Sequence, residues 1–111
     1  MELKFYYNEY NVLDVDSKGK YQSIADVLTD NNHESTIGKL LNAVDFVRKN
    51  NEDWDMSFNK SFVNININRV QCGDLFDEDE HIEMSLKQFT NVLKSWRVFI
   101  TSKESSKEIT F

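Results

Sequence analysis

The stretch from Phe62 to Val70 constrains the fold of this 111-residue chain most, because its apolar residues alternate with asparagines. Alternation of this kind places the apolar side chains on one face of a strand and the polar side chains on the other. Strands with one buried and one solvated face are typical of antiparallel sheets. The stretch therefore predicts a strand of such a sheet, with Val63, Ile65 and Ile67 facing the core and Asn64, Asn66 and Asn68 facing outward.

Two amphipathic segments predict helices that cover the apolar face of this sheet. In the first, apolar residues recur with helical spacing and form one stripe, made of Ile37, Leu40, Leu41, Val44 and Val47. This helix is expected to begin at Ser35 or Thr36 and to end at Asn50-Asn51. The second opens with a capping box, Ser85 followed three residues later by Gln88. Its apolar face comprises Leu86, Phe89, Val92, Leu93 and Trp96.

The remaining elements complete a fold that mixes strands and helices. Strands are expected at residues 2–10, 54–58 and 81–84, a turn at residues 14–22, and a short helix from a cap at Ser23 to about Leu28. Residues 71–76 either continue the strand from Phe62 or begin the next one, and the tail after residue 100 either frays or adds an edge strand. We predict an α+β fold with a mainly antiparallel sheet packed against two to three helices, forming a single domain over residues 1–111.

The net charge of −6 belongs to one segment of the chain. Residues 70–86 contain no base and six acids, which are Asp74, Asp77, Glu78, Asp79, Glu80 and Glu83. The other 94 residues carry 13 acids and 13 bases, so they are formally neutral. A block of like charge must be solvated, paired with a partner or filled with cations. It is therefore either an exposed loop that favours solubility, a docking surface for a basic protein, or a cation site.

The acidic balance and the cysteine content narrow the functional classes. Sequence-independent binding to nucleic acid and to anionic membranes depends on Lys and Arg, so neither a nucleic acid nor a membrane is expected as partner. Cys72 is the only cysteine, which excludes an intramolecular disulfide and predicts a buried, inert thiol. The first nine residues lack the basic and apolar regions of a signal peptide. A cytoplasmic protein is expected.

No pattern of catalytic or metal-binding residues stands out. The chain has no glycine-rich phosphate loop and no paired ligand spacing around His33, His81 or Cys72. Residues 14–19 begin like a calcium loop, but Lys18 and Ala25 occupy positions that need oxygen ligands. We therefore expect no enzyme activity, no metal and no cofactor. A housekeeping or regulatory module with a metal-binding acidic loop stays open as the alternative, and so does a small enzyme built around one of the histidines.

Trp54 is the second candidate feature for binding, because it stands between Asp53 and Asp55. A tryptophan flanked by carboxylates fits either a core position at the start of a strand or an interface anchor with steering charges. Trp96 closes the apolar stripe of the last helix and is expected in the core. The asparagine face of the strand is either solvated or a hydrogen-bonding surface, which Arg69 and Gln71 would extend.

The segment from His81 to Ile100 resembles the ending of many small bacterial immunity proteins, over 20 of the 111 residues. In those proteins a strand leads into a Ser- or Thr-capped helix with Phe, Leu and Trp on its inner face. The resemblance implies a protein that neutralises a polymorphic toxin, as in contact-dependent growth inhibition. Such proteins are typically short, acidic and cytosolic, and are encoded beside a basic nuclease or other toxin.

These observations converge on one functional hypothesis. The chain is expected to bind a basic toxin domain, as a monomer within the complex, and to block access to the toxin's site. The binding surface is expected to combine the acids of the charged segment with the tryptophan and its neighbours; its residues are Asp74, Asp77, Glu78, Asp79, Glu80, Glu83, Trp54, Asp53 and Asp55. Carboxylates on this surface would steer association with the toxin.

Overall fold

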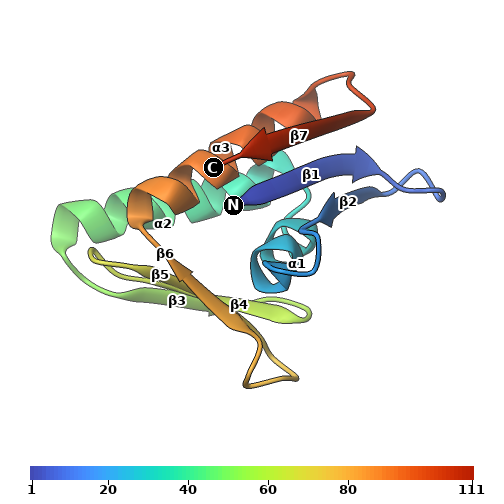
Figure 1. Ribbon diagram of the computed structural model, residues 1–111. Coiled ribbons are helices and arrows are strands. Elements are labelled where there is room, and N and C mark those ends of the chain that lie inside the picture. Colours follow the sequence, from blue (N-terminus) through green and yellow to red (C-terminus); the bar gives the residue numbers. More distant parts are fainter.

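The strands of this protein form two separate antiparallel sheets in the computed structural model, which describes residues 1–111 (Figure 1). One sheet has the strand order β2-β1-β7, with β1 at Glu2–Tyr7, β2 at Leu13–Asp16 and β7 at Ser106–Thr110. The other has the order β3-β4-β5-β6, with β3 at Trp54–Ser57, β4 at Ser61–Ile65, β5 at Val70–Asp74 and β6 at His81–Met84. The helices are α1 at Gln22–Asp30, α2 at Glu34–Asn50 and α3 at Leu86–Thr101. The α+β fold is confirmed.

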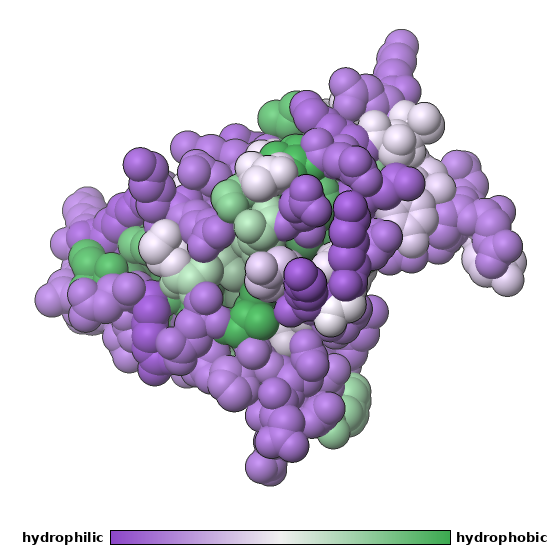
Figure 2. Space-filling model, in the orientation of Figure 1, coloured by the Kyte–Doolittle hydropathy of each residue, from purple (hydrophilic) through white to green (hydrophobic).

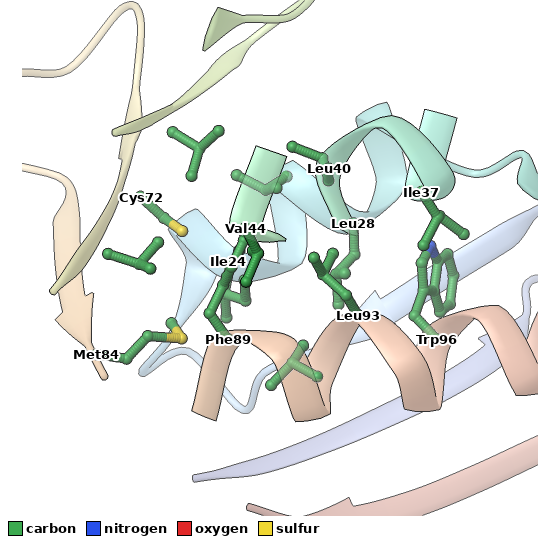
Figure 3. Close-up of a cluster of buried hydrophobic side chains, with 14 of the residues drawn as sticks. Ile24, Leu28, Ile37, Leu40, Val44, Cys72, Met84, Phe89, Leu93 and Trp96 are labelled. Carbon is green, nitrogen blue, oxygen red and sulfur yellow. The ribbon is translucent and has the colours of Figure 1, made fainter. Parts of the chain in front are cut away.

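The helices fill the space between the two sheets. Helix α1 contacts β2 of the first sheet and β4, β5 and β6 of the second, while α2 and α3 pack against each other. Buried side chains from both sheets and all three helices form one cluster of 23 residues, and Figure 3 shows part of it around Leu28, Phe89 and Leu93. Trp96 is fully buried there, as predicted, and its Nε1 donates to the carbonyl of Asn31 at 3.0 Å. No helix combines the length and apolar character needed to cross a membrane.

The strand predicted from Phe62 to Val70 is in fact a hairpin. β4 ends at Ile65 and β5 begins at Val70, with a turn between them. The side-chain Oδ1 of Asn66 accepts the backbone N–H groups of Asn68 and Arg69, each at 2.9 Å. An asparagine that binds the backbone two residues ahead forms a turn in place of a strand. The predicted row of three asparagines is therefore wrong, because only Asn64 lies within a strand.

The N-terminal third also differs from prediction. The first strand ends at Tyr7, and the predicted turn at residues 14–22 is wrong because Leu13–Asp16 forms β2, which pairs with β1. The turn itself is shorter: Asp16 Oδ1 accepts the N–H of Lys18 at 2.7 Å, and Gly19 has a φ of 75°. Glycine suits this left-handed conformation because it has no Cβ. At the other end of the chain, the tail forms the edge strand β7 beside β1.

Two of the three predicted helix caps are wrong. Ser23 is buried one residue inside α1, and its hydroxyl donates to the carbonyl of Glu80 at 3.1 Å. Helix α2 begins at Glu34 with His33 at the N-cap position, so neither predicted residue caps it. The cap of α3 is confirmed, because the Ser85 side chain accepts the N–H of Gln88 at 3.0 Å.

Candidate functional site

The outer face of the four-stranded sheet carries a polar row that crosses all four strands. Asp55 on β3 lies opposite Asn64 on β4, Asn64 opposite Gln71 on β5, and Gln71 opposite Glu83 on β6. Val63, one residue from Asn64, is fully buried, so the row faces away from the core. Adjacent strands lie about 4.8 Å apart, which makes the row about 14 Å long. It offers amide groups in the middle and carboxylates at both ends.

The next row on this outer face contains an aromatic side chain. Phe62 on β4 lies opposite Ser57 on one side and Gly73 on the other, and Gly73 lies opposite His81. A Cβ built on Gly73 would overlap Cε1 and Cζ of the Phe62 ring. The ring therefore lies across the glycine backbone, and the missing side chain at Gly73 makes room for it. Together with Asn64 and Gln71, Phe62 lines a hollow of about 410 Å³.

Arg69 changes the charge of this face. Its Nη1 lies 2.6 Å from Oε1 of Glu83, and both side chains are about half exposed. An exposed pair of this kind contributes at most about 1 kcal/mol to stability. Its effect on the surface is larger, because it pairs one of the six acids of the charged segment with a base just outside that segment. The charge on the segment is therefore partly compensated at Glu83 and uncompensated in the loop.

The loop between β5 and β6, residues 75–80, is ordered by its own polar groups. Asp74 Oδ1 accepts the N–H of Phe76 at 2.7 Å, and Asp77 Oδ1 accepts the N–H of Asp79 at 3.0 Å. The N–H of Glu80 donates to the carbonyl of Asp77 at 3.1 Å, and the Glu80 carbonyl accepts the N–H of Asp74 at 3.0 Å. Asp74 and Asp77 thus each accept a hydrogen bond from the loop backbone, and these bonds give the loop a defined shape.

The tip of this loop is acidic and exposes a large aromatic side chain. Asp77, Glu78 and Asp79 are exposed, and none has a base within 4 Å. Phe76 is 81% exposed beside them, and the neighbouring Leu75 is exposed too. The projection at the bottom of the view in Figure 2 is mostly hydrophilic. Sequence reasoning missed Phe76; the signal available was an aromatic residue inside the acidic run, with acids two positions away on either side.

The structure separates the predicted binding residues into two groups. The loop holds Asp74, Asp77, Glu78, Asp79 and Glu80, at the end of the sheet where β5 leads into β6. Asp53 and Asp55 lie towards the other end of the strands, and both are exposed. Asp55 and Glu83 lie in one row across the sheet because of the register in which the four strands pair. Trp54 faces inward, opposite the buried Ile65, and its half-buried ring packs on the core.

The groups that could support other chemistry are dispersed. His33 and His81 are exposed, and neither lines any of five surface hollows of the molecule. Cys72 is fully buried, and burial raises the pKa of its thiol to about 12. No group of three or more His, Cys, Asp or Glu side chains is placed to hold a metal ion. The polar sheet face and the acidic loop are thus the candidate functional surfaces.

Comparisons with known proteins give no relative for this chain. No family model matches it, and no curated protein and no solved structure is significantly similar to it.

Proposed function

We propose that this chain is an immunity protein that binds and neutralises a basic toxin domain, such as a nuclease, in the cytoplasm. The acidic loop between β5 and β6 is the proposed primary contact. Binding there would cover the toxin's site and prevent its substrate from entering. The proposal combines the resemblance of the strand and helix at residues 81–100 with the chemistry of the loop surface.

The exposed Phe76 is the observation that carries this proposal. A phenylalanine left 81% exposed costs solubility and gains nothing for the fold of an isolated chain. Aromatic anchors dominate the energy of protein interfaces, and surrounding charges accelerate encounter with an oppositely charged partner. Phe76 with the unpaired carboxylates of Asp77, Glu78 and Asp79 supplies both components within four consecutive residues.

The order within the loop supports the same role. A loop whose backbone is already held by Asp74 and Asp77 loses less conformational entropy on binding than a free loop. The contact of Ser23 with the Glu80 carbonyl ties the loop to helix α1 and thus to the core. These contacts leave the Phe76 ring and the carboxylates of residues 78 and 79 available to a partner.

Charge removal in the loop tests the proposal. The proposal places the gene of a basic toxin domain beside this one, and that domain is the probe. The triple variant is Asp77→Asn, Glu78→Gln, Asp79→Asn. We expect its association rate constant to fall about tenfold or more at low ionic strength and to approach the parent value at high salt. Protection of growing cells against the toxin should weaken in parallel. Asn at position 77 keeps the side-chain oxygen that binds residue 79.

Matched variants on the far side of the molecule control this experiment. Glu9→Gln, Glu104→Gln, Glu108→Gln removes the same number of exposed charges away from the loop. Phe76→Ala is compared with Tyr10→Ala, because Tyr10 is 78% exposed at the turn between β1 and β2. Phe76→Ala should raise the dissociation constant by about 30-fold, and Tyr10→Ala should leave it within about twofold. Equal effects of the two charge variants, or full protection by the loop variant, would show that the loop is not the docking surface.

The alternative function, a housekeeping or regulatory module whose acidic loop binds a metal ion, has no supporting observation. Asp74 and Asp77 direct an oxygen to backbone N–H groups of the loop, and the remaining carboxylates do not converge on one point.

A further inference from the structure

Strand β3 has a free edge whose backbone groups are unpaired. β3 lies at the end of its sheet and pairs only with β4. The N–H of Phe58 donates to the carbonyl of Ser61 at 2.8 Å, which sets the phase of the ladder. Because hydrogen-bonded pairs alternate along an antiparallel pair, Met56 and Trp54 bond to β4. The N–H and C=O groups of Asp55 and Ser57 therefore point away from the sheet, as a template for another strand.

Two hollows flank this edge, one on each face of the sheet. The outer hollow, of about 410 Å³, is bordered by Asp55, Ser57 and Phe62. The inner hollow, of about 200 Å³, lies between the edge and the helices and is bordered by Met56, Phe58 and Thr36. Side chains of an added strand alternate between the two faces, so every second one would enter each hollow. The edge thus offers main-chain pairing together with space for both sets of side chains.

The charges along the edge select the occupant. The carboxylates of Asp53 and Asp55 are exposed and have no base within 4 Å. A second copy of β3 paired antiparallel with Trp54 opposite Met56 would place Asp55 opposite Asp55, which is unfavourable. A strand with Lys or Arg on its outer side would instead neutralise both carboxylates. The inner hollow is bordered by Met56 and Phe58 and by five polar residues, and apolar side chains on the other side of that strand would contact the first two. The polar residues are Asp30, Asn31, Thr36, Lys39 and Asn59.

We propose that the free edge of β3 accepts an extended strand of the partner protein, with cationic residues facing outward and apolar residues facing helix α2. This strand addition rests on the proposed function in that it names how the same basic partner makes a second contact. It is physically separate from the acidic loop, at the opposite edge of the sheet from β6. The short length of β3, Asp55 within it and Asp53 just before it discourage self-association and leave the edge open to a basic strand.

A peptide of alternating Lys and Val, eight residues long and capped at both ends, is the probe. It is titrated into the protein carrying the loop variant Asp77→Asn, Glu78→Gln, Asp79→Asn, so that the loop cannot capture it. We expect saturable amide shifts in residues 53–57 and hydrogen exchange slowed about tenfold or more at the amides of Asp55 and Ser57. A peptide with Glu in place of Lys should not bind.

Two matched proline variants decide whether main-chain pairing is responsible. Ser57→Pro removes one outward N–H from β3, and Ser106→Pro removes one from the edge strand β7 of the other sheet. Proline is tolerated on edge strands where the N–H faces solvent, and melting curves check that both variants fold. Ser57→Pro should raise the peptide's dissociation constant about tenfold or more, and Ser106→Pro should leave it within about twofold.

Several results would overturn the strand addition while leaving the role of the loop intact. These are equal binding by Ser57→Pro and the parent, no binding to the loop variant, or shifts confined to residues 75–80 in the parent. Conversely, normal protection by the loop variant together with peptide capture at β3 would refute the docking role of the loop and support the edge.

Discussion

Replacing Asp30 with Ala removes the anchor between helix α1 and the β3–β4 hairpin. Oδ2 of Asp30 accepts the hydroxyl of Ser61 at 2.6 Å and the backbone N–H groups of Ser61 and Lys60 at 3.1 and 3.2 Å. Ser61 is fully buried, so both of its donors would lose their acceptor without access to water. Lys60 is exposed, and its N–H can bind water instead.

These contacts set the expected magnitude of the effect. A hydrogen bond to a charged group contributes about 1.5–3 kcal/mol, and a buried donor left unpaired costs about 1–3 kcal/mol. The three bonds share one oxygen and are not additive, so we expect the free energy of unfolding to fall by about 3 kcal/mol. For a chain of this size that lowers Tm by about 12 °C. Urea denaturation and calorimetry measure both quantities.

Ser61→Ala separates the anchor from general damage to the hairpin. This variant removes one donor and leaves Asp30 bound to both backbone N–H groups, so a loss of about 1 kcal/mol is expected. The double variant should lose less than the sum of the two single variants, because both remove the same hydrogen bond. A change below about 0.5 kcal/mol for Asp30→Ala would refute the reasoning.

Two further predictions concern the core and the outer sheet face. Burial raises the pKa of the Cys72 thiol from 9.0 to about 12, so between these values the unfolded chain loses a proton that the folded chain keeps. The free energy of unfolding should be insensitive to this group below pH 9 and fall as pH rises through that range. Cys72→Ala should reduce the fall in urea titrations and leave the part that comes from Tyr6, whose pKa is raised by burial and by Asp14. Gly73→Ala should cost about 1 kcal/mol because the new Cβ displaces the Phe62 ring. In a Phe62→Ala background the cost should vanish, and a cost that persists there would place the clash elsewhere.

The helices were predictable because their signals are local. The stripe from Ile37 to Val47 and the capping box at Ser85 each need only neighbours within one or two turns of the helix. Helix α2 starts at Glu34 in place of the predicted serine or threonine. Thr36 lies in its first turn, where the hydroxyl donates to the His33 carbonyl, and the His33 side chain makes no cap hydrogen bond. Local signals therefore predicted which segments form helices better than they predicted the residues at which the helices begin and end.

The strands required information that alternation does not carry. Ile67 continues the apolar alternation of β4, yet it is exposed in a turn that the Asn66 side chain stabilises. β2 was missed because Asp14 and Asp16 are poor strand formers, and its stability comes from pairing with β1. The division of the strands between two sheets depends on β1 pairing with β7 across almost the whole chain. Pairing between strands so far apart in the chain leaves no pattern in the local sequence of either strand.

The candidate site was predictable in composition and not in arrangement. The acidic run marked the loop correctly as a charged segment, but the compensation of Glu83 by Arg69 depends on the β5–β6 pairing. Asp55 and Glu83 share a row only because four strands align in one register. The exposure of Phe76 is a property of the folded loop. In a strand, alternation of side chains between the two faces would have indicated whether Phe76 points inward, but in a loop no such rule applies.

The outer row of the four-stranded sheet has a consequence for how such a protein diversifies. Asn64 and Gln71 are held in place by main-chain hydrogen bonds, which form whatever side chain the residue carries. The core contributes Val63 and Cys72 from the opposite face of the same strands. Fold and surface chemistry are therefore encoded at alternating positions, and a substitution in the outer row changes the surface at little cost in stability. A duplicated gene could acquire a new partner through these positions while the core sequence stays the same.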